Sequence, residues 1–353
     1  MAQSIPKTTK TWNVIGQEGI ESLKLSEQPI PELGDGEVLV KIQGASLNFR
    51  DLMVSEGTFP WDAKDGVVPG SDGAGTVIAI GKRVSRFKPG DKVITVLTPP
   101  LIAGSFKEQF LKFGLGASVD GTLRSVGAFD EHGLVAMPKG LSFTEAATLS
   151  CAGLTAWNAL FGCSGRQVRA GDWVLTQGTG GVSIFAIQFA KAVGARVIAT
   201  TSSSSKAKLL EKLGADHIIN YRETPDWGAE AKKLTGGVGV DHVIEVAGPT
   251  TMNQSVVSLR LDGTITVVGS VASSGDVPQM PTLLDCWMSL FTSRGIWIGT
   301  RLQMEDMCRA IEANVKKLRP VIDSKVFKLE QTKEAYEYLA SGKHQGKVCI
   351  EIA

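Results

Sequence analysis

The sequence of 353 residues has no excess of charge of either sign and no long hydrophobic run. It contains 37 Lys and Arg against 36 Asp and Glu, which gives a net charge of +1. A chain without a basic excess does not attract a phosphate backbone, so we expect no nucleic-acid partner. No apolar run approaches the ~18 residues that cross a bilayer, and the N-terminal residues lack the apolar core of a secretory signal. We therefore expect a cytoplasmic protein without a membrane partner.

Cysteine is scarce and unpaired along the sequence, whereas glycine is abundant. The five cysteines form no C-x-x-C pair, and scattered thiols in odd number are typical of a reducing compartment. The 40 glycines follow no G-X-Y period, so they indicate many tight turns and not a collagen-like chain. With 43% hydrophobic and 21% charged residues, a chain of this length is expected to form about two globular domains.

Short stretches with strand character, separated by turns, dominate the N-terminal part of the sequence. Residues 37–42 and 75–80 have this character, and residues 92–96 form a third such stretch after a Lys-Pro-Gly-Asp turn. Strands bounded by Gly, Pro and Asp predict an antiparallel, barrel-like domain. Two apolar loops, at 52–61 and 97–102, are expected to cover a hydrophobic substrate or to pack against another part of the protein.

From residue 142 onward the pattern changes to alternating strands and helices. Helical spacing at 144–161 is followed by strands and helices in turn, at 172–177, 182–193, 196–200, 206–213, 217–219, 241–246 and 264–268. This alternation predicts an α/β fold with a doubly wound parallel sheet of Rossmann type. After a helix at 304–315, the tail has a helix at 333–339 and a closing strand at 347–352 that can rejoin the first domain. We therefore expect one domain of residues 1–150 with 318–353, and a second of residues 151–317.

A glycine-rich turn stands between the strand at 172–177 and the helix at 182–193. It comprises Gly178, Thr179, Gly180, Gly181 and Val182, followed by Ser183. Gly178 permits the tight turn, Gly180 lets the backbone approach a pyrophosphate, and the helix N-terminus attracts its charge. Ser183 replaces the third glycine of the G-x-G-x-x-G pattern with another small residue. The turn predicts a dinucleotide site; the alternative is an ordinary connection between a strand and a helix.

The end of the second strand of this domain indicates which dinucleotide is bound. Enzymes that use NAD place a carboxylate there, about 20 residues after the glycines, to hold the ribose hydroxyl. No carboxylate lies between Val197 and Lys206, and the segment instead offers Ser202 and Ser203 beside the Lys206 ammonium. Hydroxyl groups and a cation suit the 2′-phosphate of NADP(H), which we expect as the cofactor. Alternatively, the serines cap the helix that follows.

Several segments together resemble the medium-chain dehydrogenase/reductase superfamily over nearly the whole chain. These are residues 44–51 (GASLNFRD), 68–75 (VPGSDGAG), 88–93 (KPGDKV), the glycine turn and residues 342–350. The resemblance implies a chaperonin-10-like (GroES-like), mainly-β barrel domain for the substrate and a Rossmann domain for NADP. The superfamily includes zinc alcohol dehydrogenases, which hold their catalytic metal through Cys, His and Cys.

By this resemblance the three zinc-ligand positions correspond to Asn48, Ser71 and Cys151. Only Cys151 is of a ligand type, although Asp72 matches the acidic residue that follows the His position. One thiol cannot hold a catalytic zinc, which takes at least three protein ligands. Residues 95–112, where a structural zinc loop is expected, contain no cysteine. The chain is therefore similar to the zinc-free, quinone oxidoreductase-like branch, and we expect no metal site.

The resemblance also implies which residues contact the cofactor besides the glycine turn. Tyr221 resembles the tyrosine beside the 2′-phosphate, Lys206 its cationic partner, and Thr155 the threonine at the nicotinamide. Further contacts are implied near strand ends, at Gly248, Gly269, Ser270, Gly299 and Arg301. For each of these residues the alternative is an ordinary role in a core or a turn.

Asn48 is the candidate catalytic residue, because its amide can donate a hydrogen bond to a substrate carbonyl. Alternatively it orders its own loop. We expect Arg50 and Asp51 to form a structural ion pair or turn anchor, and Cys151 to be a small buried residue. The nicotinamide supplies the hydride, and a quinone or enone then becomes a delocalised enolate that a few hydrogen bonds stabilise.

The sequence thus predicts NADPH-dependent reduction of a conjugated carbonyl in a hydrophobic small molecule, without zinc. The alternatives are a zinc-free alcohol dehydrogenase or ketone reductase, and a non-catalytic NADPH-binding protein. Apolar strands expected at 264–268 and 295–298 leave an edge that a second copy of the chain would cover. We therefore expect a homodimer.

Overall fold

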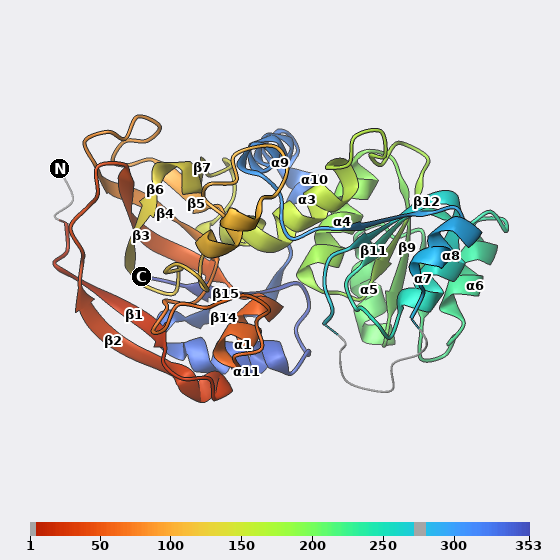
Figure 1. The fold of residues 1–353 in the computed structure, drawn as a ribbon, viewed down its shortest axis with the longest axis horizontal. Helices are drawn as coiled ribbons and strands as arrows, with labels where there is room; N and C mark the ends of the chain where they lie inside the picture. Colours follow the sequence, from red (N-terminus) through yellow and green to blue (C-terminus); the bar gives the residue numbers. More distant parts are fainter. Residues whose placement is uncertain (1–4, 272–279) are drawn as a thin grey trace. The chain divides into compact units, whose positions relative to one another are not determined.

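A computed structural model describes residues 5–271 and 280–353 (Figure 1). The chain forms two compact units, Met1–Leu154 with Thr300–Ala353, and Thr155–Gly299. The sequence predicts the boundaries at 150/151 and 317/318, so the structure moves the second boundary earlier. The reason is that helix α9 (Arg301–Ala313) packs on strand β7 (Leu134–Ala136) of the first unit, where Glu305 forms an ion pair with Arg86 at 3.1 Å.

The first unit is built on an antiparallel sheet, as the sequence predicts. Its strands follow the order β14-β15-β3-β4-β5-β7, and β6 also pairs with β3. Their bounds are β3 Glu37–Ser46, β4 Asp72–Ile80, β5 Lys92–Thr95, β6 Val126–Asp130, β14 Ile322–Lys328 and β15 Lys347–Glu351. Only the β14–β15 pair is parallel among these strands. A separate antiparallel pair is formed by β1 (Thr8–Val14) and β2 (Leu23–Pro29).

Helices occupy some segments that the sequence predicts as loops or as one continuous helix. The apolar loop expected at 52–61 is helical in its first half, because α1 spans Phe49–Ser55. The helix expected at 144–161 is realised as α2 (Phe143–Ala147), a π-helical turn η4 (Leu149–Gly153) and α3 (Leu154–Phe161). The remaining helical segments of the unit are η1 Gly19–Ser22, η2 Glu108–Phe113, η3 Glu131–Gly133, α10 Val315–Leu318, η5 Leu329–Gln331 and α11 Thr332–Ala340.

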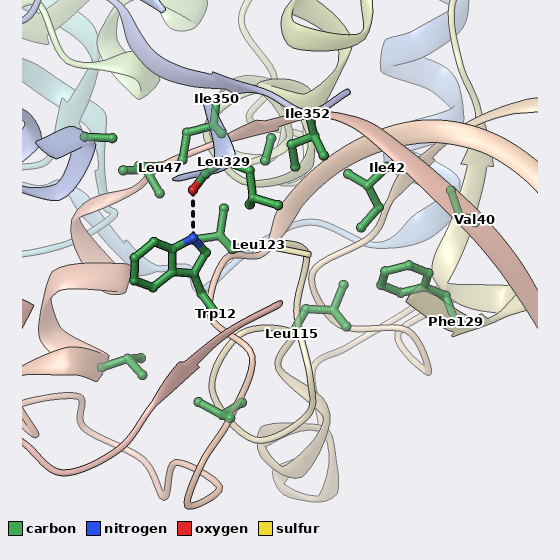
Figure 2. Close-up of a cluster of buried hydrophobic side chains, with 14 of the residues drawn as sticks. Trp12, Val40, Ile42, Leu47, Leu115, Leu123, Phe129, Leu329, Ile350 and Ile352 are labelled. Atoms are coloured by element: carbon green, nitrogen blue, oxygen red, sulfur yellow. Dashed lines mark hydrogen bonds between the residues drawn. The ribbon is translucent and has the colours of Figure 1, made fainter. Parts of the chain in front are cut away.

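The C-terminal tail rejoins the first unit, which confirms that part of the sequence prediction. Strand β15 pairs with β3, so that Cys349 lies opposite Ser46 (Figure 1). The tail also completes the core of the unit: the buried Trp12 indole donates a hydrogen bond of 2.7 Å to the carbonyl of Leu329 (Figure 2). The apolar side chains around this bond come from both ends of the chain, so the unit cannot form its core without the tail.

The second unit has the parallel sheet that the strand–helix alternation predicts. Its order is β10-β9-β8-β11-β12-β13. From β8, successive strands are added toward one edge as far as β10 and then, from β11, toward the other edge, while all pairs stay parallel. The strands are β8 Trp173–Gln177, β9 Arg196–Thr201, β10 His217–Asn220, β11 Val240–Glu245, β12 Leu259–Val267 and β13 Thr292–Gly295. The helices are α3, which belongs to this unit from Thr155 onward, α4 Gly181–Ala192, α5 Ser204–Lys212, α6 Trp227–Leu234, α7 Met252–Ser258 and α8 Leu283–Met288. Every residue of β8 is buried, as expected for a central strand covered on both faces.

One strand of the second unit differs from its prediction. The strand expected at 295–298 lies at Thr292–Gly295 instead, and its sequence TSRG is not apolar. The apolar residues that suggested it come directly after the strand, where Ile298 is buried. Strand β13 still forms the edge of the sheet, because it pairs only with β12 in the order given above. Over residues 5–271 and 280–353, no helix is long and apolar enough to cross a membrane.

Candidate active site and cofactor site

The glycine turn connects β8 to α4 with the geometry that a dinucleotide requires. Gly178 has φ +71°, a left-handed conformation that favours glycine, and its N–H donates 2.8 Å to the Thr200 carbonyl. Gly180 is the exposed N-cap of α4, and no protein atom lies within 4 Å of a Cβ built on it. The N-terminus of a helix of 12 residues therefore opens onto unoccupied space, where backbone N–H groups and the helix dipole favour an anion.

Ser183 serves as the small third residue of the turn, as the sequence predicts. It is 1% exposed, and its hydroxyl donates 2.6 Å to the carbonyl of Gln177 at the end of β8. This hydrogen bond ties the first turn of α4 to the strand before it. A serine thus fits where a glycine is usual, because its hydroxyl finds a backbone acceptor inside the packed contact.

A buried carboxylate organises the neighbouring loop after β11, and sequence reasoning missed it. Glu245 is 0% exposed and accepts hydrogen bonds from the Gln177 side chain at 2.7 Å, the Gly248 N–H at 2.9 Å and the Thr251 hydroxyl at 2.7 Å. Gly248 has φ +92°, and a Cβ there would lie 2.5 Å from the hydroxyl oxygen of Ser270. Two predicted cofactor residues, Gly248 and Ser270, therefore lie side by side, at strand ends next to the glycine turn.

The segment predicted to select NADP(H) lies at the same end of the sheet. Strands β9 and β10 are parallel, and the Tyr221 N–H donates 3.0 Å to the Thr201 carbonyl, which brings Tyr221 next to the serine segment. Ser203 occupies the N-cap position of α5, but its side chain makes no capping hydrogen bond; its hydroxyl lies 3.2 Å from the Ser205 hydroxyl. Ser202 and Lys206 are half-buried, and the Tyr221 side chain is exposed.

The other predicted cofactor residues lie in different surroundings. Thr155 and Gly299 are buried, whereas Gly269 is exposed just after β12. Arg301 belongs to the first unit, at the start of α9. Its guanidinium lies 3.0 Å from His132 Nδ1 and 3.4 Å from a Glu305 carboxylate oxygen, so two partners already hold it there.

Three strand ends of the first unit meet around Asn48. Ser46 ends β3, and the register places it opposite Asp72 at the start of β4. Lys347 begins β15, which pairs with the other edge of β3. We call Ser46, Asn48, Ser71, Asp72 and Lys347 the Asn48 cluster. Asn48 alone among these five is partly exposed; the others are at most 3% exposed.

Hydrogen bonds connect all members of the Asn48 cluster. The Lys347 ammonium donates to Asn48 Oδ1 and, at 2.6 Å, to the Leu47 carbonyl, and it lies 3.3 Å from Asp72 Oδ2. Asp72 also accepts from the Ser46 hydroxyl at 2.7 Å and from the Ser71 hydroxyl at 2.9 Å. Asn48 Nδ2 lies 3.5 Å from Ser71 Oγ, at the limit of a hydrogen bond.

Arg50 and Asp51 form the structural pair that the sequence predicts. Their charged groups lie 3.5 Å apart and both side chains are buried. Arg50 donates 2.8 Å to the Leu115 carbonyl, and Asp51 accepts 2.7 Å from the Asn48 N–H at the start of α1. Desolvation raises the pKa of Asp51 to about 6, against the lowering effect of the Arg50 charge and the backbone hydrogen bond. The pair anchors the backbone that carries Asn48.

The three positions that hold zinc in other members do not form a metal site in this chain. The Asn48 oxygen already accepts from an ammonium group, and the Ser71 hydroxyl donates to Asp72. Cys151 is the one ligand-type side chain of the three; desolvation, with the Asp72 charge as a second cause, raises the pKa of its thiol to about 12. In the described residues, no three His, Cys, Asp or Glu side chains are grouped so as to hold a metal ion. The donor set does not fit zinc.

Lys347 is the member of the cluster that sequence reasoning missed. One signal was available: it is a charged residue at the start of the strand predicted at 347–352, whose other residues are apolar and buried except for the exposed Glu351. Its partners are more than 270 residues away along the chain, at 46–48 and 71–72, and no local motif joins them. Glu245, in contrast, gave no signal in the sequence, because a carboxylate at the end of a strand is common on a protein surface.

Comparison with known proteins places the chain in a family. Residues 34–139 match the alcohol dehydrogenase GroES-like domain, and residues 181–313 match the zinc-binding dehydrogenase family. A zinc-type alcohol dehydrogenase-like protein of Schizosaccharomyces pombe is 45% identical over 95% of this chain and 96% of its own. The chain belongs to the medium-chain dehydrogenase/reductase superfamily. It is an oxidoreductase of that superfamily with a site for a nicotinamide cofactor.

Two further relatives have names that denote different reactions. An acryloyl-coenzyme A reductase of Sulfurisphaera tokodaii is 32% identical, over 94% of this chain and 97% of its own. The solved structure of an NAD-dependent alcohol dehydrogenase has a TM-score of 0.86 and 33% identity, and the match covers 98% of this chain and 100% of the other. The predicted fold class, a GroES-like domain with a Rossmann sheet, is confirmed by these comparisons and by the sheet topology.

Proposed function

We propose that this protein is an NADPH-dependent, zinc-independent reductase of conjugated carbonyls, a quinone or an enone, in a hydrophobic small molecule. The observation that carries the proposal is the hydrogen bond that the Asn48 side-chain oxygen accepts from Lys347. Ammonium groups only donate hydrogen bonds, so the contact with Lys347 identifies the amide oxygen of Asn48 and leaves its N–H₂ group as the donor. Asn48 is the partly exposed member of the cluster, so this donor is the group that a substrate oxygen can reach.

The proposed reduction uses a hydrogen-bond donor, the Asn48 amide, in place of a metal ion. A hydride from C4 of NADPH adds to the β-carbon of the conjugated carbonyl, and the electron pair of the double bond moves to the oxygen. The resulting enolate accepts a hydrogen bond from Asn48 Nδ2, and its α-carbon takes a proton from water. From an enone the products are the saturated ketone and NADP⁺; a quinone, which takes up the same hydride and proton, gives the hydroquinone and NADP⁺. A saturated ketone gives a localised alkoxide instead, which needs a stronger electrophile than one neutral amide.

The preference for NADP(H) rests on the segment after β9. It has no carboxylate between Val197 and Lys206, and its two serines and its lysine follow Thr201, whose carbonyl accepts from the Tyr221 N–H. A hydroxyl-rich, cationic surrounding suits a phosphate and lacks the acceptor that holds an unmodified ribose.

The test is NADPH oxidation with three matched acceptors: a quinone, an enone, and the saturated ketone of the same carbon skeleton. We expect the quinone or the enone to be reduced at least tenfold faster than the saturated ketone. Reduction of the saturated ketone at an equal or higher rate would support a second candidate, a zinc-free alcohol dehydrogenase, which the alcohol dehydrogenase names of several relatives favour. Tight NADPH binding without turnover of any acceptor would indicate a non-catalytic binding protein.

We further propose a homodimer that forms through the edge of the parallel sheet. Strand β13 is an edge strand, and helix α8 nearby in sequence exposes Leu283 (91%), Trp287 (69%) and Met288 (65%). An apolar patch beside an open strand edge favours association with a second copy. Light scattering should give about twice the chain mass of 37.5 kDa, and Trp287→Glu should shift it toward the monomer. A stable monomer of the unmodified protein at micromolar concentration would contradict the proposal.

A further inference from the structure

A buried lysine stands directly behind the proposed donor of the active site. Lys347 is 3% exposed; its ammonium donates hydrogen bonds to the Leu47 carbonyl and to Asn48 Oδ1, and it forms an ion pair with Asp72 Oδ2 at 3.3 Å. Protein groups thus surround the ammonium, so nothing requires it to contact substrate. Its charge nevertheless reaches the exposed end of the cluster through the Asn48 amide.

We propose that Lys347 is a positioning residue that fixes the Asn48 amide with its oxygen toward the ammonium and strengthens its N–H₂ group as a donor. This inference rests on the proposed function of Asn48 as the donor to the substrate oxygen. An amide whose oxygen accepts a hydrogen bond from a cation is polarised, so its N–H groups become better donors. The ammonium also prevents the amide from rotating by 180°, because the rotated amide would point its N–H₂ group at another donor.

Asp72 makes this arrangement possible without an unpaired charge in the interior. Its carboxylate balances the ammonium at 3.3 Å, and the hydroxyls of Ser46 and Ser71 saturate its two oxygens. The ion pair lies between the ends of β4 and β15, both of which pair with β3. A buried pair of this kind costs desolvation free energy, so its retention suggests a role beyond stability. The positive charge contacts Asn48, which by the resemblance corresponds to a zinc-ligand position, and it acts on the substrate only through Asn48.

The first test is a double-mutant cycle in turnover. Lys347→Met should lower kcat about 10- to 100-fold, a share of the about 10²- to 10³-fold effect of a whole donor, with KM for NADPH unchanged. If Lys347 acts through Asn48, the Asn48→Ala/Lys347→Met protein should be no slower than Asn48→Ala alone. Lys328→Met is the matched control, because Lys328 lies on the adjacent strand in an exposed ion pair with Glu351. Full additivity of the two effects would overturn the proposal.

Removal of Lys347 alone leaves Asp72 buried without its counter-charge, which destabilises the folded protein. A second variant avoids this outcome, because Asp72→Asn/Lys347→Met removes both charges of the ion pair together. Its kcat should be at least fivefold lower than that of the unmodified protein, with the folded state confirmed by its melting temperature. Equal kcat values in two folded proteins would overturn the role of Lys347.

The second test does not depend on any substrate. The side-chain amide resonances of Asn48, assigned by their loss in Asn48→Ala, should move upfield when the ammonium is removed by Lys347→Met in the full protein, and should stay in place in Lys328→Met. Unchanged resonances in Lys347→Met would show that the ammonium does not polarise the amide. This readout separates the two proposals: if no conjugated carbonyl is reduced, the proposed function fails, while the amide shift still decides the role of Lys347.

Discussion

The cofactor site and the Asn48 cluster are built in opposite ways. The glycine turn lies within six consecutive residues, between one strand and the helix that follows it. The Asn48 cluster joins residues from three strand ends that are up to about 300 positions apart in the chain. The first site is therefore a local consequence of sequence, whereas the second exists only once the sheet of the first unit has formed.

The two sites also differ in how they handle charge. The cofactor site offers backbone N–H groups and unoccupied space at Gly180, so its binding partner brings the negative charge. The Asn48 cluster contains its own ion pair and presents only a neutral amide to the outside. The difference suggests that variants of the cofactor site will change binding, while variants of the cluster will change the chemical step.

The largest expected effect is on kcat when the proposed donor is removed. Asn48→Ala should lower kcat for an enone about 10²- to 10³-fold, as for the loss of one donor to a developing oxyanion, with the Kd for NADPH unchanged. Steady-state kinetics with fluorescence titration of NADPH measures both quantities. A kcat within threefold of the unmodified enzyme would remove Asn48 from the chemistry and leave it as a loop residue.

A second prediction concerns stability in the region that holds Asn48. Burial raises the pKa of Asp51 to about 6 from its ordinary 3.8, so the folded protein binds this proton more tightly than the unfolded chain. The free energy of unfolding should therefore fall as the pH rises from about 4 to about 6, by about 3 kcal/mol from this one group. The side chain in Asp51→Asn does not titrate, so the difference in unfolding free energy between the two proteins should change over this pH range.

Urea unfolding at several pH values measures that difference. The unmodified protein should lose stability relative to Asp51→Asn as the pH rises through 6, whatever the constant offset between them. A difference that stays constant from pH 4 to pH 7 would contradict a raised pKa at Asp51.

Much of the fold follows from periodicity, while the exact partners of charged residues do not. The strands and helices that the sequence predicts from β8 to β11 fall within one or two residues of their predicted bounds, because strands alternate with helices of clear apolar spacing. Helix α6 in the same stretch is not predicted. Strand β13 lies three residues earlier than predicted, since the sequence TSRG has no apolar signal and pairing with β12 alone determines its position. Likewise the roles of Lys347 and Glu245 depend on tertiary neighbours, which a single sequence does not identify.

The third prediction tests the cofactor site by filling its space. A Cβ at Gly180 meets no protein atom within 4 Å, and its φ of −72° suits any residue. Gly180→Val should therefore fold normally but weaken NADPH about 100-fold, because it blocks the approach of the pyrophosphate to charge-assisted N–H donors worth about 1.5–3 kcal/mol each. Gly178→Ala is the contrasting control, since its positive φ should lower the melting temperature as well. Normal NADPH affinity in Gly180→Val would contradict the proposed pyrophosphate position.

The smallest expected effect is on the choice between NADPH and NADH. Lys206→Ala should raise KM for NADPH about tenfold and leave KM for NADH almost unchanged, because only NADPH carries the phosphate. Glu211→Ala, on the same helix, serves as a control that should change neither value. Equal weakening of both cofactors, or a preference of the unmodified enzyme for NADH, would show that the serine segment does not bind a 2′-phosphate.

The central claim is that hydride transfer in this protein relies on the Asn48 cluster and not on zinc. The most direct measurement is turnover of the best conjugated acceptor before and after dialysis against a chelator, with the zinc content of the same samples determined by elemental analysis. We expect well under one zinc per chain, an unchanged rate after dialysis, and no activation when zinc is added back. One tightly bound zinc per chain, with activity that is lost on its removal and restored on its return, would contradict the account.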